Sequence, residues 1–174
     1  MEFNKLVKEE LLPILQNKGF EVVEELNNII RFSSSNMEIG IVYNDYERSN
    51  FIEIGKRDEI LYPLNDNVVK NIFNSELRIS QVTPEVFVKN LASLFTQKEG
   101  SEILKGNIKH LVKFIEQESS NYTSELIQRQ TLETASKAWE KNDYKAFVKS
   151  IDEIGIEKIP QSYQLKYKIA KQKI

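Results

Sequence analysis

The stretch FEVVEELNNIIRFSSSNMEIGIVYNDYERSNFIEIG, residues 20–55, decides the fold. Apolar and polar side chains alternate along it, and a period of two is typical of strands that are buried on one face. Asn27 and Asn28 separate its first two apolar runs, and asparagine tolerates the left-handed backbone of a tight hairpin turn. The polar segments SSSN and YNDYERSN separate the other runs. We therefore predict a four-stranded antiparallel meander whose apolar face is covered by helices.

The segments on either side of the meander have the apolar spacing of helices. Residues 2–18 place apolar side chains three or four positions apart, which predicts an amphipathic helix. Pro13 lies inside that pattern, so we expect a kink or a break near Leu12. Beyond the meander, helical patterns follow one another to the C-terminus, and Thr83-Pro84-Glu85 carries the residue types of a helix start. A helix, a meander and then a mostly helical second half predict the α+β class.

The composition is that of an ordinary folded protein in a reducing compartment. The 174 residues include 40% hydrophobic residues, 29% charged residues and no cysteine, so a core can form without disulfides. No linker rich in glycine, serine or proline interrupts the chain. We therefore expect residues 1–63, the helix and sheet, and residues 64–174, a helical region packed on them, to form one continuous domain.

Hydropathy and charge limit the cellular locations and the classes of partner that we expect. The N-terminus lacks the pattern of a signal peptide, and no apolar run is long enough to cross a bilayer, so we expect a cytoplasmic protein without membrane contact. The formal net charge is -2, which disfavours nucleic acid as a partner. Acidic residues gather in the N-terminal part of the chain: Glu9, Glu10, Glu21, Glu24, Glu25, Glu38 and Glu47.

Residues that carry the common enzymatic and metal chemistries are scarce. Without cysteine, His110 is the only imidazole or thiolate ligand for zinc, and a Ser-His-Asp arrangement would need the same histidine. His110 lies beside the core position Leu111 in a helical pattern, which favours a structural role. The six glycines are dispersed and do not have the spacing that cradles a nucleotide phosphate. We expect no catalytic residues, no cofactor and no metal.

One catalytic alternative stays open, a Mg²⁺-dependent nuclease of the restriction-endonuclease type. Such enzymes place an acid on one strand and an acid and a lysine on the next, so that the carboxylates hold the metal and the lysine assists the attacking water. Asp45, Glu53 and Lys56 follow that order. Two residues separate Glu53 from Lys56, so strand alternation turns their side chains to opposite faces unless a bulge forms at Gly55.

The polar segment between the last two expected strands is also a candidate binding loop. Its asparagine, aspartate and serine residues favour a turn, and its charges remain in water. Aromatic and acidic side chains stand next to each other at its tip, which suits contact with a basic protein partner. The residues of this candidate protein-binding site are Asp45, Tyr46, Glu47 and Arg48.

The segment ASKAWEKNDYKAFVKSIDEIG near the C-terminus has the pattern of two closely packed helices. The small residues Ala135 and Ala138 precede Trp139, and the aromatic residues Tyr144 and Phe147 follow it, as in a tetratricopeptide hairpin. One hairpin is not a repeat array, so we expect Trp139 to lie in the core. A helical adaptor or regulatory domain that works through this region is the second alternative function.

Two segments carry a resemblance to a known class of proteins. LLPILQNKGFEVVEE…IIRF covers the first helix and strands, and AWEKNDYKAFVKSIDEI…YQLKYKIAKQK closes the chain. With Gly19-Phe20 and the pair Trp139 and Tyr144 as its clearest residues, this layout resembles small bacterial immunity proteins of polymorphic-toxin and contact-dependent inhibition systems. The resemblance implies a non-enzymatic cytoplasmic protein that neutralises a cognate toxin domain by direct binding over its active or cofactor site. The acidic N-terminal half would suit a basic toxin domain.

Overall fold

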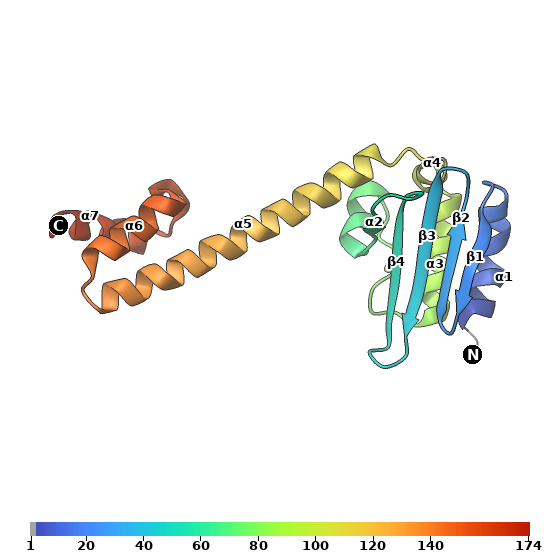
Figure 1. Ribbon diagram of the computed structural model, residues 1–174, viewed down its shortest axis with the longest axis horizontal. Helices are drawn as coiled ribbons and strands as arrows, with labels where there is room; N and C mark the ends of the chain where they lie inside the picture. The colour runs from blue at the N-terminus through green and yellow to red at the C-terminus, as the bar shows by residue number, and fades with distance from the viewer. Residues whose placement is uncertain (1–2) are drawn as a thin grey trace. The chain divides into compact units, whose positions relative to one another are not determined.

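The computed structural model describes residues 3–174 and confirms the α+β class (Figure 1). A helix comes first, an antiparallel sheet follows, and helices make up the second half of the chain. The elements are α1 (Phe3–Gln16), β1 (Glu21–Leu26), β2 (Ile29–Ser33), β3 (Met37–Asn44), β4 (Ser49–Lys56), β5 (Tyr62–Pro63), α2 (Asp66–Ile72), α3 (Pro84–Thr96), α4 (Lys98–Leu104), α5 (Lys109–Glu140), α6 (Tyr144–Ile154), the 3₁₀ turn η1 (Ile156–Lys158) and α7 (Gln161–Lys171).

The meander has five strands, in the order β1-β2-β3-β4-β5, so the expectation of four strands was wrong by one. The additional strand, β5, pairs Tyr62 and Pro63 with Ile54 and Glu53 of β4. A strand of two residues leaves no alternation in the sequence, because a period of two needs about four residues to be recognised. The helix and antiparallel meander that begin the chain are as predicted.

The residues form two compact units, Met1–Glu116 and Gln117–Ile174, which we call the N-terminal and C-terminal units. The sequence pattern suggested one continuous domain, with its helical region starting at residue 64. The observed division lies later because α2, α3 and α4 share the core of the sheet: Val69, Leu91 and Leu104 are buried in the same cluster as the strands. The division therefore falls inside α5.

One face of the sheet forms the core of the N-terminal unit. Two rows of buried side chains cross β2, β3 and β4: Ile30, Ile41 and Ile52, then Phe32, Ile39 and Ile54. They pack in one cluster with buried side chains of α1 and α3: Val7, Leu11, Leu15, Phe87, Leu91 and Leu94. Figure 1 shows both helices on the same face of the sheet. A shift of one residue in the pairing of the strands would move these buried side chains to the opposite, solvent-facing side of the sheet. The buried rows therefore fix the register of the strands.

α1 runs from Phe3 to Gln16 without a break, although Pro13 lies inside it. Proline has no backbone N–H, so the carbonyl of Glu9 loses its helical donor. Both Pro13 and Glu9 are exposed, and water can bond the freed carbonyl on that side of the helix. Of the two outcomes expected near Leu12, a kink or a break, the break does not occur.

The C-terminal unit has a small core of its own. Its buried side chains come from α5, α6, α7 and the η1 segment: Ala135, Phe147, Val148, Ile151, Ile159 and Ala170. Trp139 packs against this cluster, with its ring centroid 5.2 Å from that of Phe147 and 5.6 Å from that of Tyr144. Trp139 is thus half-buried at the edge of the core in which we expected it to lie.

α5 is 32 residues long and crosses the division between the two units. The side chains of residues 116–127, near its middle, are all exposed. Neither α5 nor any other helix within residues 3–174 is both long and apolar enough to span a membrane.

Candidate functional site

The candidate binding residues Asp45, Tyr46, Glu47 and Arg48 form the turn that joins β3 to β4, which we call the β3–β4 turn. The last strand pair before it is Asn44 with Ser49, so the turn contains four residues. All four are exposed, and Tyr46 has 98% of its surface accessible. An aromatic ring that is this exposed gains nothing from burial in the chain itself.

Side-chain hydrogen bonds hold the β3–β4 turn in one conformation. The side-chain carbonyl of Asn44 accepts hydrogen bonds from the backbone N–H groups of Tyr46, at 3.0 Å, and Glu47, at 3.2 Å. The Asn28 amide, in the turn between β1 and β2, donates to the carboxylate of Asp45. These bonds order the tip before any partner arrives, and an ordered loop loses less entropy on binding.

A hollow of about 570 Å³ lies beside the β3–β4 turn, at the start of α3. It is lined by Tyr43, Glu47, Arg48, Ser49, Gln81, Val82, Thr83 and Pro84. Arg48 and Gln81 both have positive φ angles, 51° and 53°, which is uncommon for residues other than glycine and asparagine. The Asn50 amide donates to the carbonyl of Val82 at 2.6 Å and so ties β4 to the segment that precedes α3.

The residues of this hollow that precede or begin α3, residues 81–84, are not part of the binding site predicted from the sequence. Thr83 and Pro84 were recognised as a helix start, and Thr83 does cap α3 by accepting from the N–H of Val86. Nothing in the sequence places that helix start next to the β3–β4 turn, because the two segments are far apart along the chain and meet only in the fold, where Asn50 bonds to Val82.

The three residues of the nuclease alternative are not brought together. Asp45 lies in the β3–β4 turn, Glu53 lies in the middle of β4, and Lys56 ends β4. At about 3.4 Å per residue, the eight residues of β4 place its two ends roughly 24 Å apart. Among residues 3–174, no group of three or more histidine, cysteine, aspartate or glutamate residues is placed to hold a metal ion.

Gly55 does not carry the bulge that would have turned Glu53 and Lys56 to one face. The register of β3 and β4 is continuous from Asn44 and Ser49 to Met37 and Lys56. A Cβ atom on Gly55 would lie 2.5 Å from the carbonyl oxygen of Ile60, so the glycine serves the close passage of the β4–β5 connection. The side chains of Glu53 and Lys56 therefore leave opposite faces of the sheet.

His110 and the polar residues of the β2–β3 turn show no arrangement of a catalytic or metal site among the described residues. His110 is exposed in the first turn of α5. Ser34 accepts a hydrogen bond from the N–H of Met37 at 3.0 Å, which is the local side-chain-to-backbone bonding that serine favours in turns. Asn36 donates to the carbonyl of Lys105 at 3.2 Å, which ties the β2–β3 turn to the end of α4.

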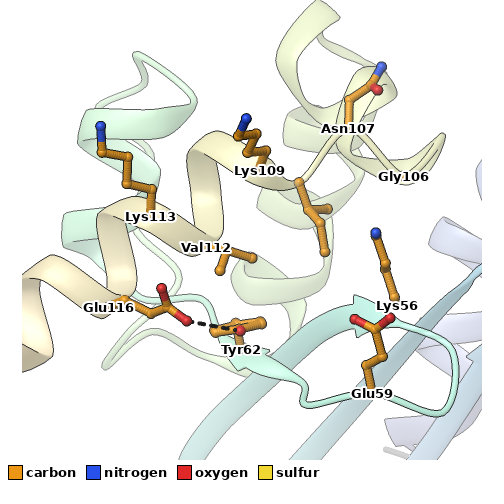
Figure 2. A pocket seen from close by; sticks show the side chains of 10 residues that line it. Lys56, Glu59, Tyr62, Gly106, Asn107, Lys109, Val112, Lys113 and Glu116 are labelled. Atoms are coloured by element: carbon orange, nitrogen blue, oxygen red, sulfur yellow. Dashed lines mark hydrogen bonds between the residues drawn. The ribbon is translucent and has the colours of Figure 1, made fainter.

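A second hollow of about 570 Å³ lies between the β4–β5 connection and the first turns of α5 (Figure 2). Tyr62 donates from its hydroxyl to the Glu116 carboxylate at 3.4 Å. Desolvation first, and then the negative charge of Glu116, raise the pKa of Tyr62 above its usual value. Lys56 and Glu59 lie on the side of the hollow opposite to Glu116, while the side chains of Lys109 and Lys113 point away from Tyr62. The hollow mixes both charges and offers no single ligand chemistry.

Comparison with known proteins finds no significant match: no protein-family model, no curated protein and no solved structure matches this chain. The geometry of the chain itself therefore identifies the candidate site. That geometry favours the β3–β4 turn, because it combines full exposure, an aromatic ring, two carboxylates and a conformation that is already ordered.

Proposed function

We propose that this protein is a non-enzymatic binding protein of the immunity type, which neutralises a cognate toxin domain by direct contact. The observation that carries the proposal is the β3–β4 turn, where the exposed Tyr46 stands between the carboxylates of Asp45 and Glu47. Tyrosine is enriched among the residues that dominate binding energy in protein interfaces, because it brings a large rigid ring and a polar tip.

The charge of the N-terminal unit supports a basic partner. Residues 1–116 contain eighteen acidic and fourteen basic residues, whereas residues 117–174 contain eight acidic and ten basic ones. A net negative charge on a protein unit accelerates the approach of a positively charged protein and disfavours acidic partners. The basic partner that we propose is a toxin domain whose active or cofactor site is positively charged.

Inhibition by such a protein needs contact and no chemistry. The β3–β4 turn is narrow enough, at four residues, to enter a cleft, with Tyr46 as the apolar anchor. Asp45 and Glu47 would then pair with basic side chains at the rim of that cleft. Because the turn is ordered by Asn28 and Asn44, the binding energy is not spent on folding a loop.

Co-expression with the product of each neighbouring gene, followed by co-purification and calorimetry, tests the proposal. We expect one stable complex, and we expect Tyr46→Ala to weaken it about tenfold or more, as is typical of a tyrosine that anchors an interface. Tyr122→Ala is the matched control, because Tyr122 is also exposed, at 70%, but lies on α5. The absence of any stable complex, or an equal loss of affinity in both variants, would contradict the proposal.

A further inference from the structure

The face of the sheet opposite to the core is not covered by the helices of the N-terminal unit. α1 and α3 pack on the other face, and in Figure 1 they lie behind the strands. The register assigns Leu26, Ile29, Val42 and Phe51 to the uncovered face, and none of these four belongs to the core cluster or packs against it. We call this surface of β1–β4 the open face.

An apolar row crosses all four strands of the open face. Leu26 pairs with Ile29, Ile29 with Val42 and Val42 with Phe51, so the four side chains are neighbours from strand to strand. Leu26 is 55% and Phe51 is 45% exposed, and the two residues between them are half-buried. With strands about 4.8 Å apart, the row is roughly 15 Å long, which is the width of a helix with its side chains or somewhat more.

Glutamates occupy four of the eight positions in the next two rows of the same face. One row consists of Glu24, Arg31, Gly40 and Glu53, and the other consists of Glu21, Ser33, Glu38 and Gly55. Glu21 and Glu24 share this face only because the register shifts between Val22 and Glu24, where β1 carries a bulge. In these strands the open face thus holds four glutamates and one arginine.

The single arginine does not neutralise this face. Arg31 lies between Glu24, at 3.7 Å, and Glu38, to which it also forms an ion pair. Glu21 and Glu53 form no ion pair within residues 3–174. The Glu53 side chain lies across Gly40, with its Oε1 atom 3.1 Å from where a Cβ atom on Gly40 would be. Two carboxylates on this face therefore remain available to a cation from outside.

We infer that the open face is the docking surface for a basic protein partner, which covers the apolar row with an apolar side chain and pairs lysine or arginine with Glu21 and Glu53. The inference rests on the proposed function, since it extends the contact from the β3–β4 turn to the sheet. The hydrogen bond between Asn28 and Asp45 keeps that turn at the end of the sheet where the apolar row lies. Turn, apolar row and acidic rows follow one another along the strands.

The spacing of the rows defines the partner further. Glu53 and Phe51 are two residues apart on β4, which places the acid about 7 Å from the apolar row. On a partner helix, residues four positions apart are separated by about 6 Å along the axis. A helix with an apolar residue and a lysine or arginine four positions away therefore matches this face.

The test uses the full chain and a synthetic amphipathic helix of leucine and lysine, with a second peptide in which glutamate replaces every lysine. At low ionic strength, NMR titration with the lysine peptide is expected to shift the amides of Leu26, Val42 and Phe51. Fluorescence anisotropy is expected to show a two- to fivefold weaker affinity, roughly the effect of one exposed ion pair, for Glu53→Gln and for Glu21→Gln. Phe51→Thr, which keeps a strand-forming residue, should weaken binding as well.

Asp58→Asn is the matched control, because it removes one negative charge from a side chain that is 91% exposed on the β4–β5 connection. It should leave the affinity for the lysine peptide unchanged. The inference is overturned if the amides of the apolar row do not shift, if Asp58→Asn weakens binding as much as Glu53→Gln, or if the glutamate peptide binds equally well.

This test separates the docking surface from the proposed function. If no neighbouring gene product forms a complex, the proposed function fails, and the peptide titration still decides whether the open face binds basic helices. If a cognate complex forms but is insensitive to Glu53→Gln and Phe51→Thr, the proposed function stands and the docking surface is refuted.

Discussion

The side-chain amide of Asn28 donates a hydrogen bond to the carboxylate of Asp45, and this bond joins the β1–β2 turn to the β3–β4 turn. The two residues belong to different hairpins, so the bond makes one ordered edge out of two separate loops. That edge carries Tyr46 and adjoins the apolar row of the open face.

Asn28→Gly tests whether this bond orders the turn. Asn28 has a φ angle of 57°, which glycine adopts without strain, so the variant removes the bond and keeps the backbone. We expect the free energy of unfolding to fall by no more than about 1 kcal/mol, because the bond is exposed. NMR relaxation should report greater mobility of Asp45 and Tyr46. Unchanged order parameters in the turn would show that Asn44 alone is sufficient to hold it.

Gly55→Ala should destabilise the protein where Gly40→Ala should not. A Cβ atom on Gly55 would meet the Ile60 carbonyl oxygen at 2.5 Å, and backbone atoms cannot give way cheaply. We expect a loss of about 1–3 kcal/mol in the free energy of unfolding measured with urea. At Gly40 the nearest atoms belong to the flexible Glu53 side chain, at 3.1 Å or more, so the loss should stay below about 1 kcal/mol. Equal losses in the two variants would contradict this assignment.

The strands could be read from the sequence because alternation is a direct consequence of one-sided burial. Ile30, Ile41 and Ile52 had to face one way, and the register shows them in one row. β5 escaped detection because a pair of residues has no period. The hollow beside the β3–β4 turn could not be predicted from the sequence. Gln81 and Thr83 are far from the turn along the chain, and only the fold brings them next to it.

The sequence does not mark the division between the two units. A continuous helix, α5, crosses it, so the glycine- and proline-rich linker that usually marks a boundary is absent. The segment Ser119-Ser120-Asn121 was the available signal, since serine and asparagine are weak helix formers. The apolar row of the open face could not be predicted, because these strands carry apolar residues on both faces. The sequence pattern alone does not show which face packs against the helices.

The pH dependence of stability can be tested at Glu102. Hydrogen bonds from Lys105, at 2.7 Å, and Asn107, at 2.6 Å, and the positive charge of Lys105 lower the pKa of the Glu102 carboxyl. A carboxyl whose pKa is lower in the folded state stabilises the fold above its unfolded-state pKa, and this stabilisation is lost as the pH falls through the folded-state value. We expect Lys105→Ala to raise the pKa of Glu102 in an NMR titration. A pKa that does not move would mean that Asn107 and the charge of Lys18, and not Lys105, lower it.

Hydrogen exchange should reveal a weak segment within α5. The side chains of residues 117–127 are all exposed, so no packing supports the helix there. We expect these amides to exchange at least about tenfold faster than those of the buried Leu111 and Ala135. Ser120→Ala should slow the exchange, since alanine favours the helix by about 0.5 kcal/mol over serine. Uniform protection along the whole of α5 would contradict this prediction.

Truncation after Ser119 should leave the N-terminal unit folded. The core cluster of that unit and the side chains packed against it end with Ile115, so the shortened chain keeps every residue of the cluster. We expect cooperative unfolding in urea, with circular dichroism of a mixed helix and sheet protein. Loss of cooperativity would show that the C-terminal unit stabilises the sheet.

The same truncation distinguishes the proposed function from the helical adaptor alternative. The β3–β4 turn and the open face both lie before Ser119, whereas the adaptor would bind through α6 and α7. Once a partner has been identified by co-purification, the shortened chain should bind it with an affinity within about threefold of the full chain if the proposal is right. A complete loss of binding by a shortened chain that still unfolds cooperatively would assign the contact to residues 120–174, because only these residues, the rest of α5 with α6, η1 and α7, have been removed.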